Sequence, residues 1–155
     1  AARNVLISLG PYRDATKVLS EEDKGAVIAG LVSVEMGLPL AMSRMYPYLV
    51  PGAFVVPVDM EYFKGYLSVN GVNRGDKLVV IDDTLATGGT IVSLIRAAML
   101  AGAEIVDIRV VVEKLGSGGR ERIQRELGLD VKSAIGIRID ANGIIAVETF
   151  MGAPI

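Results

Sequence analysis

The chain has 155 residues, a length that suits one domain with a single hydrophobic core. Its lack of cysteine excludes disulfide bonds, thiolate nucleophiles and cysteine zinc sites, and its lack of histidine leaves carboxylates, Tyr or Lys for any proton transfer. The formal net charge of −2 provides no basic field for nucleic acid, so we expect no nucleic-acid partner.

Hydrophobic residues make up 51% of the chain, whereas aromatic residues make up only 5%. This aliphatic composition suits strands that are buried on both faces, as in α/β proteins. No apolar run reaches the roughly 18 to 20 residues of a membrane span, and the first ten residues lack the regions of a signal peptide. We therefore expect residues 1–155 to form one cytoplasmic domain that binds no membrane.

The first half of the chain alternates short apolar runs with one helical pattern. Residues 4–10 and 16–20 are predicted strands, the first closed by Gly-Pro. Val27, Leu31 and Val34, together with the small residues Ala26, Ala29 and Gly30, predict a buried helix that stops at Gly37. Residues 38–45 are predicted to return as a strand.

Residues 46–66 contain three prolines and no sustained period, which predicts a mobile lid or a hairpin. The second half repeats the order of strand, loop, helix and strand. The predicted elements are a strand at 77–83, a helix at 90–101, a strand at 103–114, a charged helix at 120–128, and two closing strands at 131–139 and 143–150. This order predicts a central parallel sheet flanked by helices, with ligands at the carboxyl ends of the strands.

The segment from Leu78 to Thr90 carries the clearest chemistry. Its apolar strand ends in Asp82 and Asp83, and a turn rich in Thr and Gly then leads into a helix. Small residues let backbone N–H groups approach an anion, and the amino end of the helix adds partial positive charge. The segment is therefore a predicted phosphate cradle.

This cradle differs from other glycine-rich phosphate loops. It has neither the GxxxxGK[ST] pattern of a Walker A loop nor the GxGxxG pattern of dinucleotide sites. Two acids directly before the cradle would repel a polyphosphate, but carboxylates accept hydrogen bonds well from the hydroxyls of a sugar. The pattern predicts a site for a ribose that carries a 5-phosphate.

All 13 positions from Leu78 to Thr90 resemble the signature of the type I phosphoribosyltransferases. The resemblance implies an α/β fold with a small hood and a mobile lid loop, and it makes Asp82 and Asp83 catalytic residues that bind the ribose hydroxyls. Candidates for the hood are residues 1–13, residues 113–120 and the C-terminal strands. The residues implied to bind the 5-phosphate are Thr84, Leu85, Ala86, Thr87, Gly88, Gly89 and Thr90.

Residues 22–45 resemble the adenine phosphoribosyltransferases in particular. The match implies that Glu22, Asp23, Lys24 and Gly25 form the pyrophosphate loop and that Arg44 is a cation for the same group. Met45 stands where that family commonly has Lys.

Two further segments extend this resemblance, and two other features bear on the choice of base. Glu61 and Tyr62 are similar to the family's Glu-Tyr-Gly lid, which implies a catalytic acid or base at Glu61 and a closing ring at Tyr62, although Phe63 replaces the Gly. Residues 113–123 resemble a loop that lies beside the base. Ala86 favours adenine, because hypoxanthine-guanine enzymes commonly carry Asp there, whereas residues 66–78 are similar to archaeal enzymes for 6-oxopurines.

The implied reaction transfers 5-phosphoribosyl from phosphoribosyl pyrophosphate to a purine base, adenine being favoured, in purine salvage. Mg²⁺ is expected to bridge pyrophosphate and ribose near Asp82 and Asp83, with no direct protein ligands. We expect a homodimer, the common closed assembly. Hypoxanthine, guanine, xanthine or pyrimidine acceptors, and a regulator that senses phosphoribosyl pyrophosphate without catalysis, are the alternatives.

Overall fold

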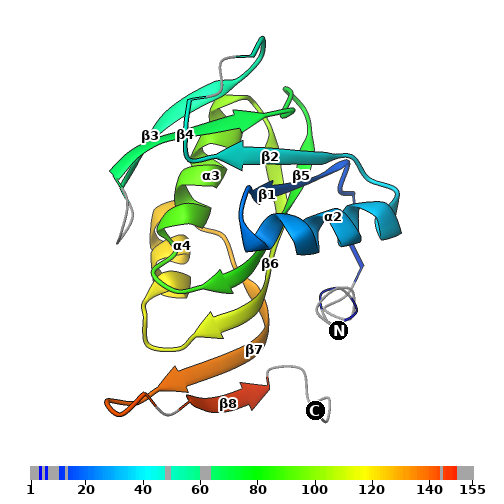
Figure 1. Ribbon diagram of the computed structural model, residues 1–155. Helices are drawn as coiled ribbons and strands as arrows, with labels where there is room; N and C mark the ends of the chain where they lie inside the picture. Colours follow the sequence, from blue (N-terminus) through cyan, green and yellow to red (C-terminus); the bar gives the residue numbers. More distant parts are fainter. Residues whose placement is uncertain are drawn as a thin grey trace.

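The computed structural model describes residues 4, 6, 11–12, 14–47, 50–59, 64–143 and 145–149, without the side chains of 58, 59, 64 and 149. Its described part contains one eight-stranded sheet with helices on both faces (Figure 1). The elements are β1 Lys17–Glu21, α2 Lys24–Met36, β2 Leu40–Arg44, β3 Phe54–Asp59, β4 Lys64–Asn70, β5 Lys77–Leu85, α3 Gly89–Leu100, β6 Glu104–Lys114, α4 Gly119–Leu127, β7 Lys132–Ile139 and β8 Ile145–Thr149.

The strand order is β3-β4-β2-β1-β5-β6-β7-β8. The five central strands, from β2 to β7 in this order, run parallel, and β3, β4 and β8 add antiparallel edges. The predicted α/β fold with a central parallel sheet is therefore confirmed. After β1 the chain adds β2 on one side and later adds β5 on the other, so a crevice opens between the carboxyl ends of β1 and β5, where such sheets bind ligands.

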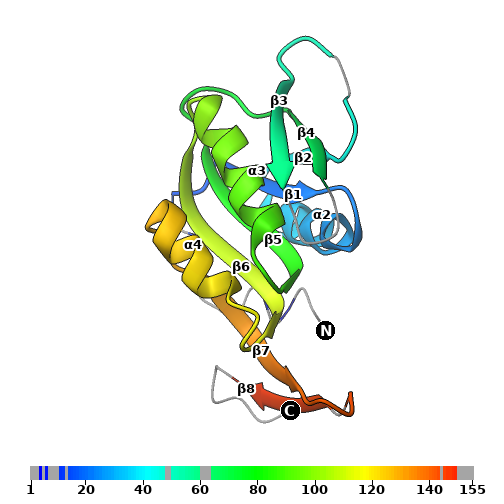
Figure 2. The same cartoon turned by 90° about the vertical axis from the view of Figure 1, so that its left-hand side faces the viewer.

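Side chains alternate between two cores along the central strands. Leu19, Leu78 and Val80 pack in the core under α3 and α4, whereas Val18 and Val79 pack in the core under α2. Figure 2 shows α3 and α4 on one face and α2 on the other. None of the described helices is long and apolar enough to cross a membrane.

The prediction that α2 is buried holds for Ala29 but is wrong for the three large apolar residues. Val27, Leu31 and Val34 are 70%, 54% and 83% exposed, and the helix instead packs through residues of which most are small, namely Gly25, Ala29, Val32 and Ser33. Small side chains let the helix axis lie close to the sheet. Because α2 is apolar on nearly all sides, hydrophobic periodicity could not distinguish the inner face from the outer face.

Two other segments refine the predictions. The predicted strand at 4–10 is wrong where it is described, because Asn4 and Leu6 are helical. The Leu6 carbonyl accepts hydrogen bonds from the side chains of Tyr12 and Arg109 rather than from a neighbouring strand. Residues 46–66 contribute β3 and part of β4, so the hairpin is confirmed, and β4 continues the sheet beside β2 with Arg44 opposite Ser68.

Arg109 of β6 is fully buried and ties the amino-terminal segment to the sheet. Its Nε donates to Asp107 Oδ2 at 2.7 Å, Nη1 donates to the Leu6 carbonyl at 2.8 Å, and Nη2 donates to the Pro11 carbonyl at 3.0 Å. The guanidinium also lies 3.6 Å from the centroid of the Tyr12 ring. A buried charge of this kind is stable only because its partners surround it.

We predict that Arg109→Met lowers the free energy of unfolding by about 3 kcal/mol, because the Leu6 carbonyl, the Pro11 carbonyl and the Asp107 carboxylate each lose one buried donor. Lys132→Met is the matched control, since its half-exposed ammonium contacts the same carboxylate at 3.0 Å. That change should cost about 1 kcal/mol or less. Urea unfolding measures both, and equal losses in the two variants would contradict the role of Arg109.

Candidate functional site at the carboxyl ends of the first and fifth strands

The predicted phosphate cradle lies where β5 passes into α3. Strand β5 extends to Leu85, so Thr84 and Leu85 belong to the strand, and residues 86–88 alone form the turn before Gly89 begins α3. The Leu85 side chain is 1% exposed in the core. Only its backbone is therefore placed to reach a ligand.

The turn is shaped by a left-handed glycine. Gly88 caps α3 at φ 76° and ψ 3°, a conformation that side chains disfavour, and its carbonyl accepts the N–H of Val92 at 2.9 Å. The first N–H groups of a helix have no partner within the helix. The first N–H groups of α3 lie in the same turn as the hydroxyls of the half-buried residues Thr87 and Thr90. This arrangement suits an anion.

Asp82 and Asp83 lie at the end of β5 beside this turn. Asp82 Oδ1 accepts the N–H of Asp83 at 2.8 Å, and Asp83 Oδ2 accepts the hydroxyl of Thr84 at 3.2 Å. Burial is the largest cause that raises the pKa of Asp82, to about 8, and the charges of Asp83 and Glu21 add to it against the opposing hydrogen bond from the Asp83 N–H. The crevice thus holds carboxylates that repel one another.

Glu21, the last residue of β1, belongs to this group although the sequence analysis did not select it. Burial, followed by the charges of Asp23, Asp83 and Glu22, raises its pKa. The sequence signal that could have selected Glu21 was its position at the carboxyl end of β1, beside the crevice between β1 and β5, which we call the switch point. In the part of the chain that the structure describes, no three acidic side chains are arranged to hold a metal ion. The oxygen donors do fit Mg²⁺ that is bound mainly by substrate oxygens and water.

The predicted pyrophosphate residues surround the start of α2. Glu22 and Asp23 form an exposed turn, and Lys24 and Gly25 begin the helix. Arg44, at the end of β2, pairs through Nε with Glu22 Oε2 at 2.8 Å. The hydroxyl of Tyr46, which the sequence analysis did not select, donates to the same oxygen at 3.2 Å. The loop and the predicted cation are therefore neighbours.

Gly25 connects the predicted pyrophosphate and ribose positions. A Cβ atom at Gly25 would lie 2.5 Å from Asp82 Oδ1 and 3.1 Å from Ser20 Oγ, so the first turn of α2 packs directly on Asp82. The predicted lid residues Glu61 and Tyr62, together with Phe63, lie outside the described residues.

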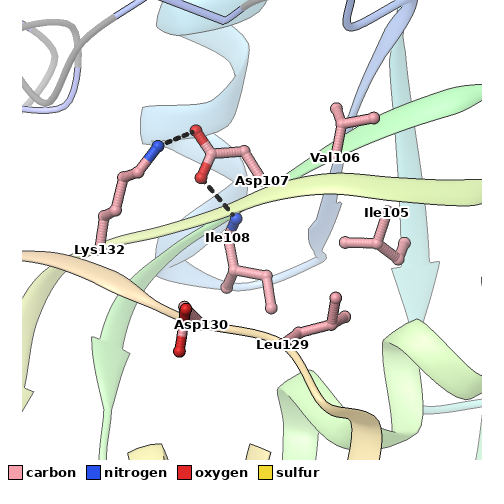
Figure 3. Close-up of a pocket in the computed structure, with 7 residues that line it drawn as sticks. All are labelled: Ile105, Val106, Asp107, Ile108, Leu129, Asp130 and Lys132. Carbon is pink, nitrogen blue, oxygen red and sulfur yellow. Dashed lines mark hydrogen bonds and ion pairs between the residues drawn. The ribbon is translucent and has the colours of Figure 1, made fainter. Parts of the chain in front are cut away.

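A cavity of about 210 Å³ lies elsewhere, at the amino ends of β6 and β7 (Figure 3). Asp107 Oδ2 accepts a hydrogen bond from Lys132 there. The lining residues are Ile105, Val106, Asp107, Ile108, Leu129, Asp130 and Lys132. None of them is a predicted site residue. We therefore assign the candidate functional site to the crevice between β1 and β5 and not to this cavity.

The chain is similar to known proteins in sequence and in fold, although no protein-family profile matches it. The hypoxanthine/guanine phosphoribosyltransferase of Methanothermococcus okinawensis is 37% identical over 134 residues, which cover 86% of this chain and 72% of the relative. That of Methanococcus voltae is 35% identical over 133 residues, covering 86% and 70%. The structure of the Giardia lamblia APRTase complexed with 9-deazaadenine has a TM-score of 0.79 and 27% identity, covering 88% and 77%. The chain belongs to the type I phosphoribosyltransferases, among the enzymes for purines.

We predict that Gly25→Ala impairs phosphoribosyl transfer, because its methyl group must displace the Asp82 carboxylate or the start of α2. Gly30→Ala is the matched control on the same helix, where an added Cβ meets nothing within 4 Å. It should raise the free energy of unfolding by up to about 1 kcal/mol and leave the rate unchanged. Steady-state kinetics decide, and equal kcat/KM in both variants would refute the contact.

The raised pKa of Asp82 predicts a pH-dependent change in stability. Below the unfolded-state pKa, Asp82 is protonated in both the folded and unfolded chains, but between that value and about 8 the folded chain holds the proton more tightly. The bound proton stabilises the folded chain relative to the unfolded chain, and this contribution to the free energy of unfolding is lost as the pH rises through the folded-state pKa. Asp82→Asn should raise the free energy of unfolding more at pH 9 than at pH 4, as measured by urea unfolding. A gain that is largest at pH 4 would be inconsistent with this electrostatic environment.

Proposed function

We propose that the chain transfers the 5-phosphoribosyl group of phosphoribosyl pyrophosphate to a purine nitrogen in purine salvage, releasing pyrophosphate and forming a nucleoside monophosphate. The observation that carries the proposal is the placement of an anion-binding turn and an acid pair side by side at the switch point. Backbone N–H groups and threonine hydroxyls suit the 5-phosphate, and the carboxylates suit the two ribose hydroxyls.

The acid pair acts on the ribose in this proposal. Asp82 and Asp83 accept the ribose hydroxyls and lie near the carbon that becomes cationic as the pyrophosphate leaves. Burial, followed by repulsion from Asp83 and Glu21, raises the pKa of Asp82 in the free protein, whereas hydrogen bonds from a bound sugar favour its ionised form. The acid pair therefore favours a ligand that brings donors and positive charge.

The leaving pyrophosphate lies toward α2 and the end of β2. Lys24 and Arg44 oppose its charge, while bound Mg²⁺ would neutralise the charge that develops on its oxygens. The ion pair between Arg44 and Glu22 orients the guanidinium before the substrate arrives. Met45 supplies no cation where the related enzymes commonly have Lys, so Arg44 carries more of this role.

Proton transfer and exclusion of water are assigned to the hairpin region. Glu61 is the acid or base for the purine nitrogen, since the chain has no histidine, and Tyr62 closes over the site. The described stem of the hairpin, formed by β3 and β4, is anchored in the sheet next to β2. The cytoplasmic location and the homodimer expected from the sequence stay predictions.

We favour a 6-oxopurine, hypoxanthine or guanine, as the base. The relatives that are 35% and 37% identical are named hypoxanthine/guanine phosphoribosyltransferases, and residues 66–78 resemble the archaeal enzymes of that kind. Adenine, which the sequence analysis favoured, is the second candidate. Ala86 and the similarity to the Giardia lamblia APRTase, at 27% identity, support it.

The test is a panel of adenine, hypoxanthine, guanine, xanthine, uracil and orotate with phosphoribosyl pyrophosphate and Mg²⁺, in which released pyrophosphate is measured. We predict that kcat/KM for hypoxanthine or guanine exceeds that for adenine by about tenfold or more, as a base-specific hydrogen bond requires. A higher value for adenine would select the second candidate.

The double variant Asp82→Asn with Asp83→Asn is the control for this panel, and it should fold but lose turnover. Release by that variant at the wild-type rate would remove the acid pair from the reaction. Binding of phosphoribosyl pyrophosphate without release of pyrophosphate for any base would identify a sensor rather than an enzyme.

A further inference from the structure

Four groups form a compact ionic cluster next to the phosphate cradle. Arg120, the second residue of α4, donates from Nε to Glu113 Oε1 at 2.9 Å and from Nη2 to Glu113 Oε2 at 2.5 Å. Its Nη1 donates to the Val131 carbonyl at 2.5 Å, and Nη2 also donates to Ser133 Oγ at 2.9 Å. The cluster joins β6, α4 and the start of β7.

The cluster is nearly closed to water at its acidic end. Glu113 is 5% exposed and Ser133 is 4% exposed, and the Ser133 hydroxyl donates to Glu113 Oε2 at 2.6 Å. Burial acts to raise the pKa of Glu113, but the hydrogen bonds from Arg120 and Ser133 and the charge of Arg120 outweigh burial and lower it. Glu113 is therefore ionised at neutral pH and holds the guanidinium in a two-point contact.

Gly119, immediately before Arg120, supports the cradle through backbone contact. A Cβ atom at Gly119 would overlap the carbonyl oxygen of Ala86 and lie 2.7 Å from Leu85 Cδ1. A Cβ atom at Gly88 would lie 2.9 Å from the Gly119 carbonyl oxygen. The turn that binds the anion therefore rests on the first residue of α4 with no side chain between them.

Glu113 connects both parts of this arrangement. Its backbone lies opposite Leu85 in the pairing of β5 with β6, while its side chain holds Arg120. A fixed Arg120 fixes Gly119, and a fixed Gly119 limits where the Ala86 carbonyl and the Gly88 backbone can lie. The conformation of the cradle thus depends on an ion pair that is formed outside it.

We propose that Arg120 and Glu113 are positioning residues, which hold the first turn of α4 so that Gly119 keeps the cradle in the conformation that binds the ribose 5-phosphate. This inference rests on the proposed role of the cradle. It assigns to the Arg120 guanidinium a task that involves no contact with the base or the sugar. Preorganised backbone donors bind an anion more tightly because less ordering is required on binding.

The experiment compares Arg120→Met, Arg120→Lys and Glu113→Gln with Arg122→Met, the matched control on the same helix. Arg122 pairs with Glu126 at 2.9 Å, one turn further along α4, and not with Glu113. Calorimetry measures the Kd for ribose 5-phosphate, and steady-state kinetics measure KM for phosphoribosyl pyrophosphate and for the base. We expect Arg120→Met to raise the Kd for ribose 5-phosphate and the KM for phosphoribosyl pyrophosphate by about tenfold or more. The KM for the base should change by less than about twofold.

Arg120→Lys should give an intermediate Kd, because an ammonium cannot span both carboxylate oxygens and the Val131 carbonyl. Arg122→Met should bind ribose 5-phosphate as the wild type does. A purely structural role would lower the melting temperature of Arg120→Met and leave the Kd of the folded protein unchanged, and this result would overturn the inference. If Arg120→Met does not fold, the Kd values of Arg120→Lys and Glu113→Gln decide in the same way.

A fifth variant, Thr87→Val, separates this inference from the proposed function on which it rests. Unchanged ribose 5-phosphate binding in Thr87→Val and in Arg120→Met would refute the cradle assignment itself, and the inference with it. Weaker binding in Thr87→Val together with wild-type binding in Arg120→Met would refute only the positioning role.

Discussion

Two contacts that leave no room for a side chain determine where the end of β5 lies. On one side Gly25 of α2 meets the Asp82 carboxylate, and on the other Gly119 of α4 meets the Ala86 carbonyl. Helices from opposite faces of the sheet thus approach the same short segment through glycine. Both the acid pair and the cradle depend on this close approach, because a bulkier residue at either position would push a helix outward.

The electrostatics of the crevice are unfavourable in the free protein. Glu21, Asp82 and Asp83 share a partly buried space, and the pKa of Glu21 and that of Asp82 are raised as a result. Groups that are kept in this state cost stability and are typical of functional sites. A ligand with hydroxyl donors and an associated cation relieves the repulsion, so binding and charge neutralisation are coupled.

Local sequence signals were enough to predict the central sheet, the helix after the cradle and the hairpin, because strand ends, glycines and apolar runs are encoded within a few residues. The strand predicted at 4–10 failed where tertiary contacts take over, since Arg109 lies 103 residues from its partner Leu6. The buried face of α2 was predicted only in part, because Val27 and Ala29, both assigned to the core from the sequence, are equally compatible with a core position when no neighbour is known. The partners of Arg120 and the proximity of Gly119 to Ala86 are likewise set only by the folded chain.

The pairing of β4 with β2 has a mechanical consequence. Ser68 lies opposite Arg44, so the stem of the hairpin and the strand that carries this proposed pyrophosphate cation share one hydrogen-bonded ladder. Any distortion of the sheet margin is transmitted along this ladder to the guanidinium. Under the proposed role of Arg44, substitutions far from the crevice, at the outer edge formed by β3, would alter release of pyrophosphate while the end of β5 keeps its shape.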